Sequence, residues 1–188
     1  VIGPRWSLDL LLLYRKDFGG ALAAKSAWPI LVYGLPSLAT RIRQEMANAR
    51  KVAEFLENDP RVEFVRYPGL DSFPQRELAR RQMRDYDGNF APGSLMYFAL
   101  AGRSPKARHD RGETFINALA KNAYSITLAV SLGHIRTLVE HPSSMTHSAI
   151  PLEEQVRNGI DPGGIRLSIG LEKPSDIIND LTRALRRL

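Results

Sequence analysis

The order of apolar and polar residues predicts a chain in which strands and helices alternate. The clearest strand pattern lies in residues 163–172, where a pair of glycines precedes an alternation of apolar residues with Arg166 and Ser168. The apolar members are Ile165, Leu167 and Ile169. A period of two places the apolar side chains on one face of a strand and the polar side chains on the other. We therefore expect a strand with one buried face, with Arg166 near its middle.

Two longer segments have the three- and four-residue spacing that is typical of amphipathic helices. The first runs from Ser37 to about Asn58, where the following Asp59-Pro60 ends it. Its apolar positions are Leu38, Ile42, Met46, Ala49, Ala53 and Leu56. The second begins at Pro174, a residue favoured in the first turn of a helix. Its expected buried stripe is Ile177, Ile178, Leu181, Ala184, Leu185 and Leu188.

The remaining predicted elements are shorter. Strands are expected at residues 62–65, 94–100, 125–130 and 135–139, and helices at 74–84, 107–122 and 151–158. In the third of these strands, Ile126, Leu128 and Val130 are expected on one face. Residues 1 to about 25 are expected to be irregular or extended, with a turn at Gly19-Gly20. This order predicts an α+β fold: a small antiparallel or mixed sheet with helices packed on one face, preceded by a long linking helix.

Composition places the chain among soluble globular proteins. Of its 188 residues, 44% are hydrophobic and 24% are charged, and there is no cysteine, so disulfides and thiolate metal sites are excluded. The apolar run around Leu10–Leu13 is interrupted by Asp9 and is far shorter than the roughly 20 residues that a membrane span needs. It also lacks the cleavage pattern of a signal peptide. We therefore expect a cytoplasmic protein that does not enter a membrane.

The net charge of +6 raises the question of nucleic-acid binding. The charge of the densest basic stretch, Arg76 to Arg84, is diluted by Glu77 and Asp85, and no aromatic residues that could stack on bases are interleaved with it. We interpret it as a solvated helix face and expect no nucleic-acid partner. His141 and His147 lie six residues apart in a loop with no carboxylate between them, so no metal site is expected.

Several motifs appear in an order that is known from one enzyme family. They are Tyr67-Pro68-Gly69-Leu70, Ser72-Phe73-Pro74-Gln75, Arg81-Gln82-Met83, Leu128-Ala129-Val130-Ser131-Leu132-Gly133-His134, and residues 137–148, TLVEHPSSMTHS. Together with the spacing to Arg166, they resemble the C-terminal domain of the Cys/Met-metabolism family of pyridoxal-phosphate (PLP) enzymes. That family includes cystathionine γ-synthase, cystathionine γ-lyase, methionine γ-lyase and O-acetylhomoserine sulfhydrylase.

The resemblance implies three substrate-binding residues. Arg166 matches the arginine that binds the substrate carboxylate, a task suited to the planar fork of a guanidinium. Ser131 lies where the family has a residue that hydrogen-bonds the same carboxylate, and Thr146 matches a threonine that supports the arginine. The residues alone favour a plainer interpretation: Arg166 as a surface arginine, Ser131 as a serine that ends a strand, and Thr146 as a residue that hydrogen-bonds within its loop. His134 departs from the family pattern and would either tune specificity or point to solvent.

The family's cofactor-binding patterns do not occur in this chain. No lysine stands in the Ser-x-Thr-Lys context of the lysine that binds PLP, so we expect no catalytic residue and no bound PLP in this chain alone. We expect residues 1–36 to be a lead-in with the start of the linking helix, residues 37–188 to be the substrate-side domain, and the N-terminal PLP domain to be absent.

The resemblance implies that the full-length enzyme uses PLP for elimination or γ-replacement on cystathionine, methionine or an O-acyl homoserine. Its expected partners are a small amino-acid substrate, the N-terminal PLP domain and further copies of itself in a dimer or tetramer. The alternative is a catalytically inactive fragment or pseudoenzyme that acts as an oligomerisation or binding module.

Overall fold

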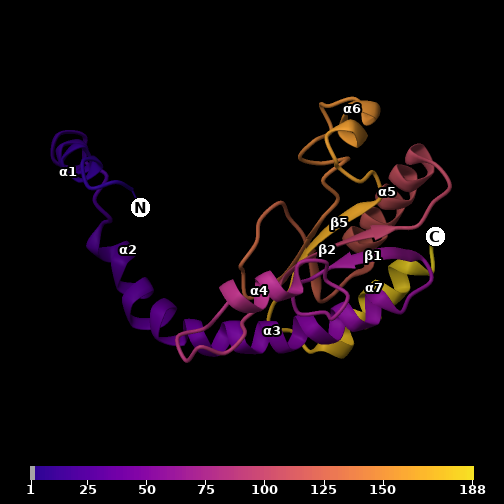
Figure 1. The fold of residues 1–188 in the computed structure, drawn as a ribbon, viewed down its shortest axis with the longest axis horizontal. Helices are drawn as coiled ribbons and strands as arrows, with labels where there is room; N and C mark the ends of the chain where they lie inside the picture. The colour runs from indigo at the N-terminus through magenta and orange to yellow at the C-terminus, as the bar shows by residue number, and fades with distance from the viewer. Residues whose placement is uncertain (1–2) are drawn as a thin grey trace. The chain divides into compact units, whose positions relative to one another are not determined.

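The computed structural model describes residues 3–188 (Figure 1), so the first two residues of the expected lead-in lie outside it. The chain divides into two compact units, residues 1–39 and 40–188. The first contains α1 (Ser7–Phe18), α2 (Ala24–Pro29) and a π-helical turn, η1 (Ile30–Gly34). The long helix α3 (Leu35–Glu57) begins in this unit and continues into the second. The functional division expected at residue 36 stays a prediction.

The expectation of an irregular or extended lead-in was wrong for α1. Helix α1 is built on a run of leucines, which are good helix formers. Asp9 lies in its first turn, while Arg15 and Lys16 lie in its last turn, and both placements complement the helix dipole. Gly19 and Gly20 then adopt positive φ angles of 83° and 86° and end the helix, as the predicted turn requires.

The second unit is built on a five-stranded mixed sheet with the order β1-β2-β5-β4-β3. The strands are β1 (Val62–Arg66), β2 (Leu95–Leu100), β3 (Ile126–Leu128), β4 (Thr137–Glu140) and β5 (Gly164–Ser168). Neighbouring strands are antiparallel except β3 and β4, which are parallel. Strand β5 therefore lies in the centre of the sheet, between β2 and β4.

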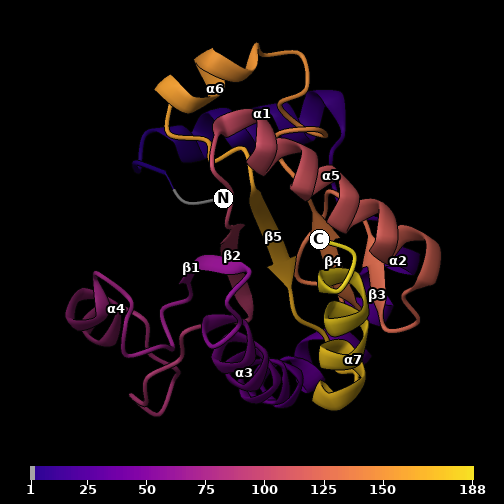
Figure 2. The same cartoon turned by 90° about the vertical axis from the view of Figure 1, so that its right-hand side faces the viewer.

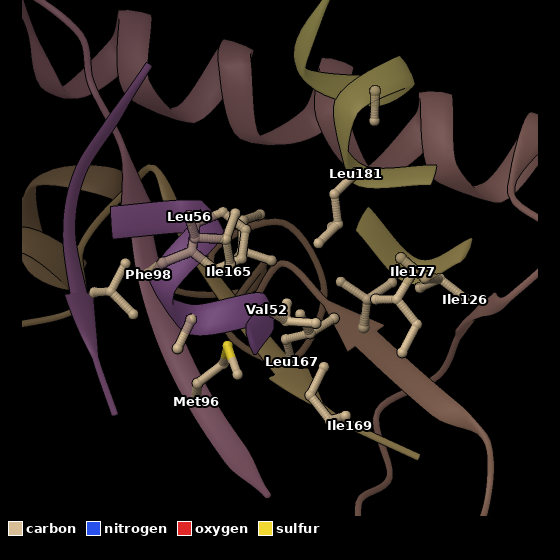
Figure 3. Packing of buried hydrophobic residues seen from close by; sticks show 14 of the residues in the cluster. Val52, Leu56, Met96, Phe98, Ile126, Ile165, Leu167, Ile169, Ile177 and Leu181 are labelled. Atoms are coloured by element: carbon tan, nitrogen blue, oxygen red, sulfur yellow. The ribbon is translucent and has the colours of Figure 1, made fainter. Parts of the chain in front are cut away.

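The alternation predicted for β5 is confirmed. Ile165, Leu167 and Ile169 are fully buried and join the apolar side chains of β2 in one cluster (Figure 3). Helix α3 contributes Val52 and Leu56 to the same cluster. Because Arg166 and Ser168 alternate with these residues, they lie on the opposite face of the sheet, which we call the outer face.

Three helices cover the core face. Helix α3 packs there with α5 (Pro105–Asn122) and α7 (Pro174–Leu185), and the last two also pack against each other (Figure 2). In α7 the predicted stripe is confirmed, with Ile178 and Leu188 only partly buried. The shorter α4 (Arg76–Gln82) and α6 (Leu152–Arg157) lie within the expected ranges. The α+β prediction, with helices on one face of a mixed sheet, is confirmed.

One burial pattern was predicted incorrectly. In the segment 125–130 only Ile126 is buried among the three residues expected on one face, while Leu128 is 40% exposed and Val130 is 55% exposed. Strand β3 is the last strand of the sheet and ends at Leu128, so Val130 has left the ladder. The apolar core does not extend this far along the sheet edge.

Candidate functional site

Arg166 lies in the middle of β5, on the outer face of the sheet. The sheet register places it beside Tyr97 of β2 on one side and beside Glu140 of β4 on the other. A side chain held on the central strand of a sheet has a well-defined backbone position, in contrast to one on a mobile loop. The outer face at this point is therefore a fixed platform for the guanidinium group.

Two groups of this chain hold the Arg166 guanidinium. Nη1 of Arg166 is 2.9 Å from Oε1 of Glu140, and Nη2 donates a hydrogen bond of 3.1 Å to the backbone carbonyl oxygen of Ser131. A guanidinium group has five N–H donors, so one hydrogen bond and one ion pair leave at least three of them without a partner among the described residues. The side chain is 25% exposed. Arg166 is thus held at two points while part of its donor set still reaches the surface.

Glu140 is the strongest contact of this arginine. Its side chain is only 3% exposed, and its Oε2 atom is buried without a hydrogen-bond partner among the described residues. Removing an ionised carboxylate from water is costly unless a cation compensates it. Arg166 supplies that compensation, so the two residues form one partly buried ion pair. Glu140 was not foreseen from the sequence, although it lies within the motif of residues 137–148, directly before His141-Pro142.

Ser131 and Thr146, the other two predicted site residues, differ in their relation to Arg166. Ser131 is adjacent to it, and the contact is made by the backbone carbonyl of Ser131. The exposed hydroxyl of Thr146 lies 3.5 Å from the carbonyl oxygen of Pro142 and 3.0 Å from Nδ1 of His147. No hydrogen bond joins it to Arg166 among the residues that the structure describes. Their roles toward a substrate stay predictions.

The loop that follows β4 is fixed by a buried polar network that sequence reasoning did not foresee. His141 is fully buried, and its ring nitrogens lie 2.7 Å from the hydroxyl of Ser144 and 2.7 Å from the carbonyl oxygen of Pro162. Burial lowers the pKa of His141, so the neutral ring with the proton on Nε2 fits these partners. Ser143 and Gln155 extend the network through a 2.6 Å hydrogen bond. This loop leads from Glu140 to Thr146.

A hollow of about 520 Å³ is lined by Tyr97, the cross-strand neighbour of Arg166, but not by Arg166 itself. One of the arginines that line it, Arg108, already pairs with Asp161 at 2.6 Å and with Glu63 at 3.1 Å. Tyr97 lines the hollow, and burial raises its pKa to about 12, so its hydroxyl stays protonated at neutral pH. Because Arg108 is compensated in this way, it attracts an anion into the hollow less strongly than its charge alone suggests.

The lysines of the described chain offer no buried amine that could hold a pyridoxal group. All six are exposed, and Lys106 forms a surface ion pair with Asp110 at 3.1 Å. A lysine that binds a carbonyl cofactor needs a pKa lowered by burial or by neighbouring cations. We therefore derive no step of the chemistry from the lysines of this chain.

Other classes of site find no support in the part of the chain that the structure covers. No three His, Asp or Glu side chains among residues 3–188 gather as metal ligands would. His134 is exposed, and its Nδ1 accepts a 3.0 Å hydrogen bond from the backbone N–H of Arg136. None of the described helices has the length and apolar character that crossing a bilayer requires.

Comparison with known proteins identifies the protein family to which this chain belongs. Residues 4–186 match the model of the Cys/Met metabolism PLP-dependent enzyme family. The chain is 41% identical to L-methionine gamma-lyase from Treponema denticola over 189 aligned residues, and 37% identical to cystathionine beta-lyase from Coxiella burnetii over 185. These alignments cover 100% and 98% of this chain.

Solved structures agree with the sequence comparison. The crystal structure of cystathionine gamma synthase from Xanthomonas oryzae pv. oryzae matches all of this chain with a TM-score of 0.78 and 33% identity. A putative O-acetylhomoserine (thiol)-lyase from Campylobacter jejuni, whose structure contains a pyridoxyl-lysine phosphate, matches 99% of it with a TM-score of 0.77 and 34% identity.

The chain therefore belongs to the Cys/Met metabolism family of PLP-dependent enzymes. It spans 43% of the length of the T. denticola relative and 44% of the X. oryzae structure. What those whole proteins bind and catalyse thus rests partly on segments that have no counterpart in these 188 residues.

Proposed function

We propose that this chain is the C-terminal, substrate-side part of a PLP-dependent enzyme of sulfur amino-acid metabolism, in which Arg166 binds the substrate carboxylate. The intact enzyme eliminates or replaces the γ-substituent, or eliminates the β-substituent, of cystathionine, methionine or an O-acyl homoserine. The observation that carries the proposal is the geometry of Arg166, which is fixed on the central strand by two contacts and keeps three N–H donors unused. Family membership supports the rest.

The chemistry of such a site depends on orientation. When bound, PLP supplies an electron sink for reactions at the substrate α-carbon. The residues of this chain would fix the carboxylate so that the bond to be broken at that carbon is correctly aligned. A guanidinium fork does this with two parallel, charge-assisted hydrogen bonds. Ser131, next to Arg166, is proposed as a second ligand of the carboxylate and Thr146 as a support of the loop.

The proposal is tested by kinetics of the intact gene product with PLP. Release of 2-oxo acids from L-methionine and L-cystathionine, and thiol-dependent replacement on O-acetyl-L-homoserine, would be measured for the wild type and for Arg166→Lys. A lysine keeps the charge but not the fork, so KM should rise about tenfold to a hundredfold, the value of one or two charge-assisted hydrogen bonds.

Arg50→Lys is the matched control. Arg50 forms an exposed ion pair with Glu54 at 2.9 Å, so its replacement should leave KM unchanged. If Arg166→Lys also leaves KM unchanged, the carboxylate role is refuted. If the intact product with PLP converts none of these substrates, the alternative of an inactive protein that serves as an oligomerisation or binding module is favoured.

A further inference from the structure

We infer that Glu140 is the positioning residue of the proposed carboxylate clamp. The inference rests on the proposed role of Arg166 and assigns a cause to its orientation. Glu140 and Arg166 are direct neighbours on adjacent antiparallel strands, and the 2.9 Å ion pair joins them across the outer face of the sheet. Cross-strand neighbours are held at a fixed separation by the ladder itself, so the partner of Arg166 has little freedom to move away.

The burial of Glu140 makes this contact rigid. The Glu140 side chain is 3% exposed and has few rotamers available. An exposed partner would lose more side-chain conformational entropy when held in one position. Its second oxygen, Oε2, has no donor among the described residues, so Arg166 is the only cation that compensates the buried carboxylate there. The two side chains therefore stay in contact, which fixes the position of Nη1 of Arg166.

The second anchor fixes the plane of the guanidinium. With Nη1 bound to Glu140 and Nη2 bound to the carbonyl oxygen of Ser131, rotation about the terminal bonds of Arg166 would break one or both contacts. The unused N–H groups then point in a set direction before any ligand arrives. Glu140 acts through Arg166, and the substrate carboxylate contacts the arginine.

Two substitutions separate position from charge. Glu140→Gln keeps an acceptor oxygen at the same place but removes the negative charge, while Glu140→Met keeps the length and apolar volume and removes the acceptor. If Glu140 holds Arg166 through the ion pair, kcat/KM of the intact enzyme for its amino-acid substrate should fall about tenfold to a hundredfold in Glu140→Met and less in Glu140→Gln, which keeps an acceptor oxygen but loses the charge. Asp59→Leu is the control, because Asp59 is a buried carboxylate that pairs with Arg61 at 2.6 Å just before β1, an edge strand that does not touch β5.

A second measurement does not depend on activity. The Nε–Hε resonance of Arg166 in ¹⁵N-labelled protein, assigned through Arg166→Lys, reports the motion of the guanidinium. Glu140→Met should increase that motion and speed exchange of the Hε proton, and Glu140→Gln should change both much less. Unfolding temperatures of all variants are recorded to confirm that they fold.

The outcomes are distinct. A loss of kcat/KM in Glu140→Met without increased motion of the Arg166 guanidinium would overturn positioning, and so would no loss in either variant. If the KM for the substrate is unchanged in every variant, Arg166→Lys included, the proposed clamp is refuted. In that case the resonance of Arg166 still shows whether Glu140 orients it.

Discussion

Gly112 offers a sharp test of how the structure organises the loop beside the site. Gly112 is buried in the middle of α5, where glycine is normally unfavourable, and Gly→Ala in a helix usually stabilises by about 1 kcal/mol. Here a Cβ atom would overlap the imidazole of His141, lying 2.7 Å from Cε1 and 2.8 Å from Cδ2. We therefore expect Gly112→Ala to be destabilising.

The magnitude follows from the two consequences of that overlap. Pushing a side chain into a filled core costs about 1–3 kcal/mol. Displacing His141 also weakens its hydrogen bonds to Ser144 and Pro162, and each buried polar group left without a partner costs about 1–3 kcal/mol. After subtraction of the helix gain, the net loss is about 3 kcal/mol. For a chain of this size it lowers the unfolding midpoint by about 6–12 °C.

The assay is thermal unfolding followed by circular dichroism, with Gly34→Ala as control. A Cβ at Gly34 would meet only the carbonyl oxygen of Pro29, at an ordinary distance of 3.7 Å. That variant should be neutral or slightly stabilising. In a His141→Ala background Gly112→Ala should cost much less, because the overlapping ring is gone. A stabilising Gly112→Ala, or an equal cost in both backgrounds, would refute the reasoning.

Three further predictions concern buried polar groups. Asp180→Ala should lower the free energy of unfolding by about 3 kcal/mol in a denaturant titration. The reason is that the Asp180 carboxylate accepts hydrogen bonds of 3.0 and 2.7 Å from the backbone N–H groups of Tyr124 and Ser125. An unchanged denaturation midpoint would contradict this prediction. Burial lowers the pKa of His141, so its contribution to the free energy of unfolding is present above about pH 6.5 and is lost as pH falls toward the folded-state pKa. His141→Asn should remove that loss in unfolding curves recorded from pH 8 to 5. Burial raises the pKa of Glu45, so its contribution to the free energy of unfolding is present below its ordinary pKa and is lost as pH rises through the folded-state pKa. Glu45→Gln should abolish this loss in the same unfolding curves. A pH dependence identical to that of the wild type would count against this prediction.

Local periodicity is the reason that much of the fold could be predicted. The strand around Arg166, the long helix α3 and the stripe of α7 each repeat a pattern whose meaning depends on only a few neighbouring residues. The order of motifs also carried the family resemblance, and with it the choice of Arg166. Helix α1 was missed, although its leucines and its acidic start and basic end were visible in the sequence.

The partners of the site residues could not be obtained in this way. That Glu140 faces Arg166 depends on the register of β4 against β5, and that His141 is buried depends on the approach of α5 at Gly112. Both are contacts between segments that lie more than 20 residues apart, and no local pattern encodes them. The sequence by itself determined which strand carries the arginine and which face it shares. Only the tertiary structure decided which groups hold the guanidinium, because a guanidinium is oriented by the atoms that surround it.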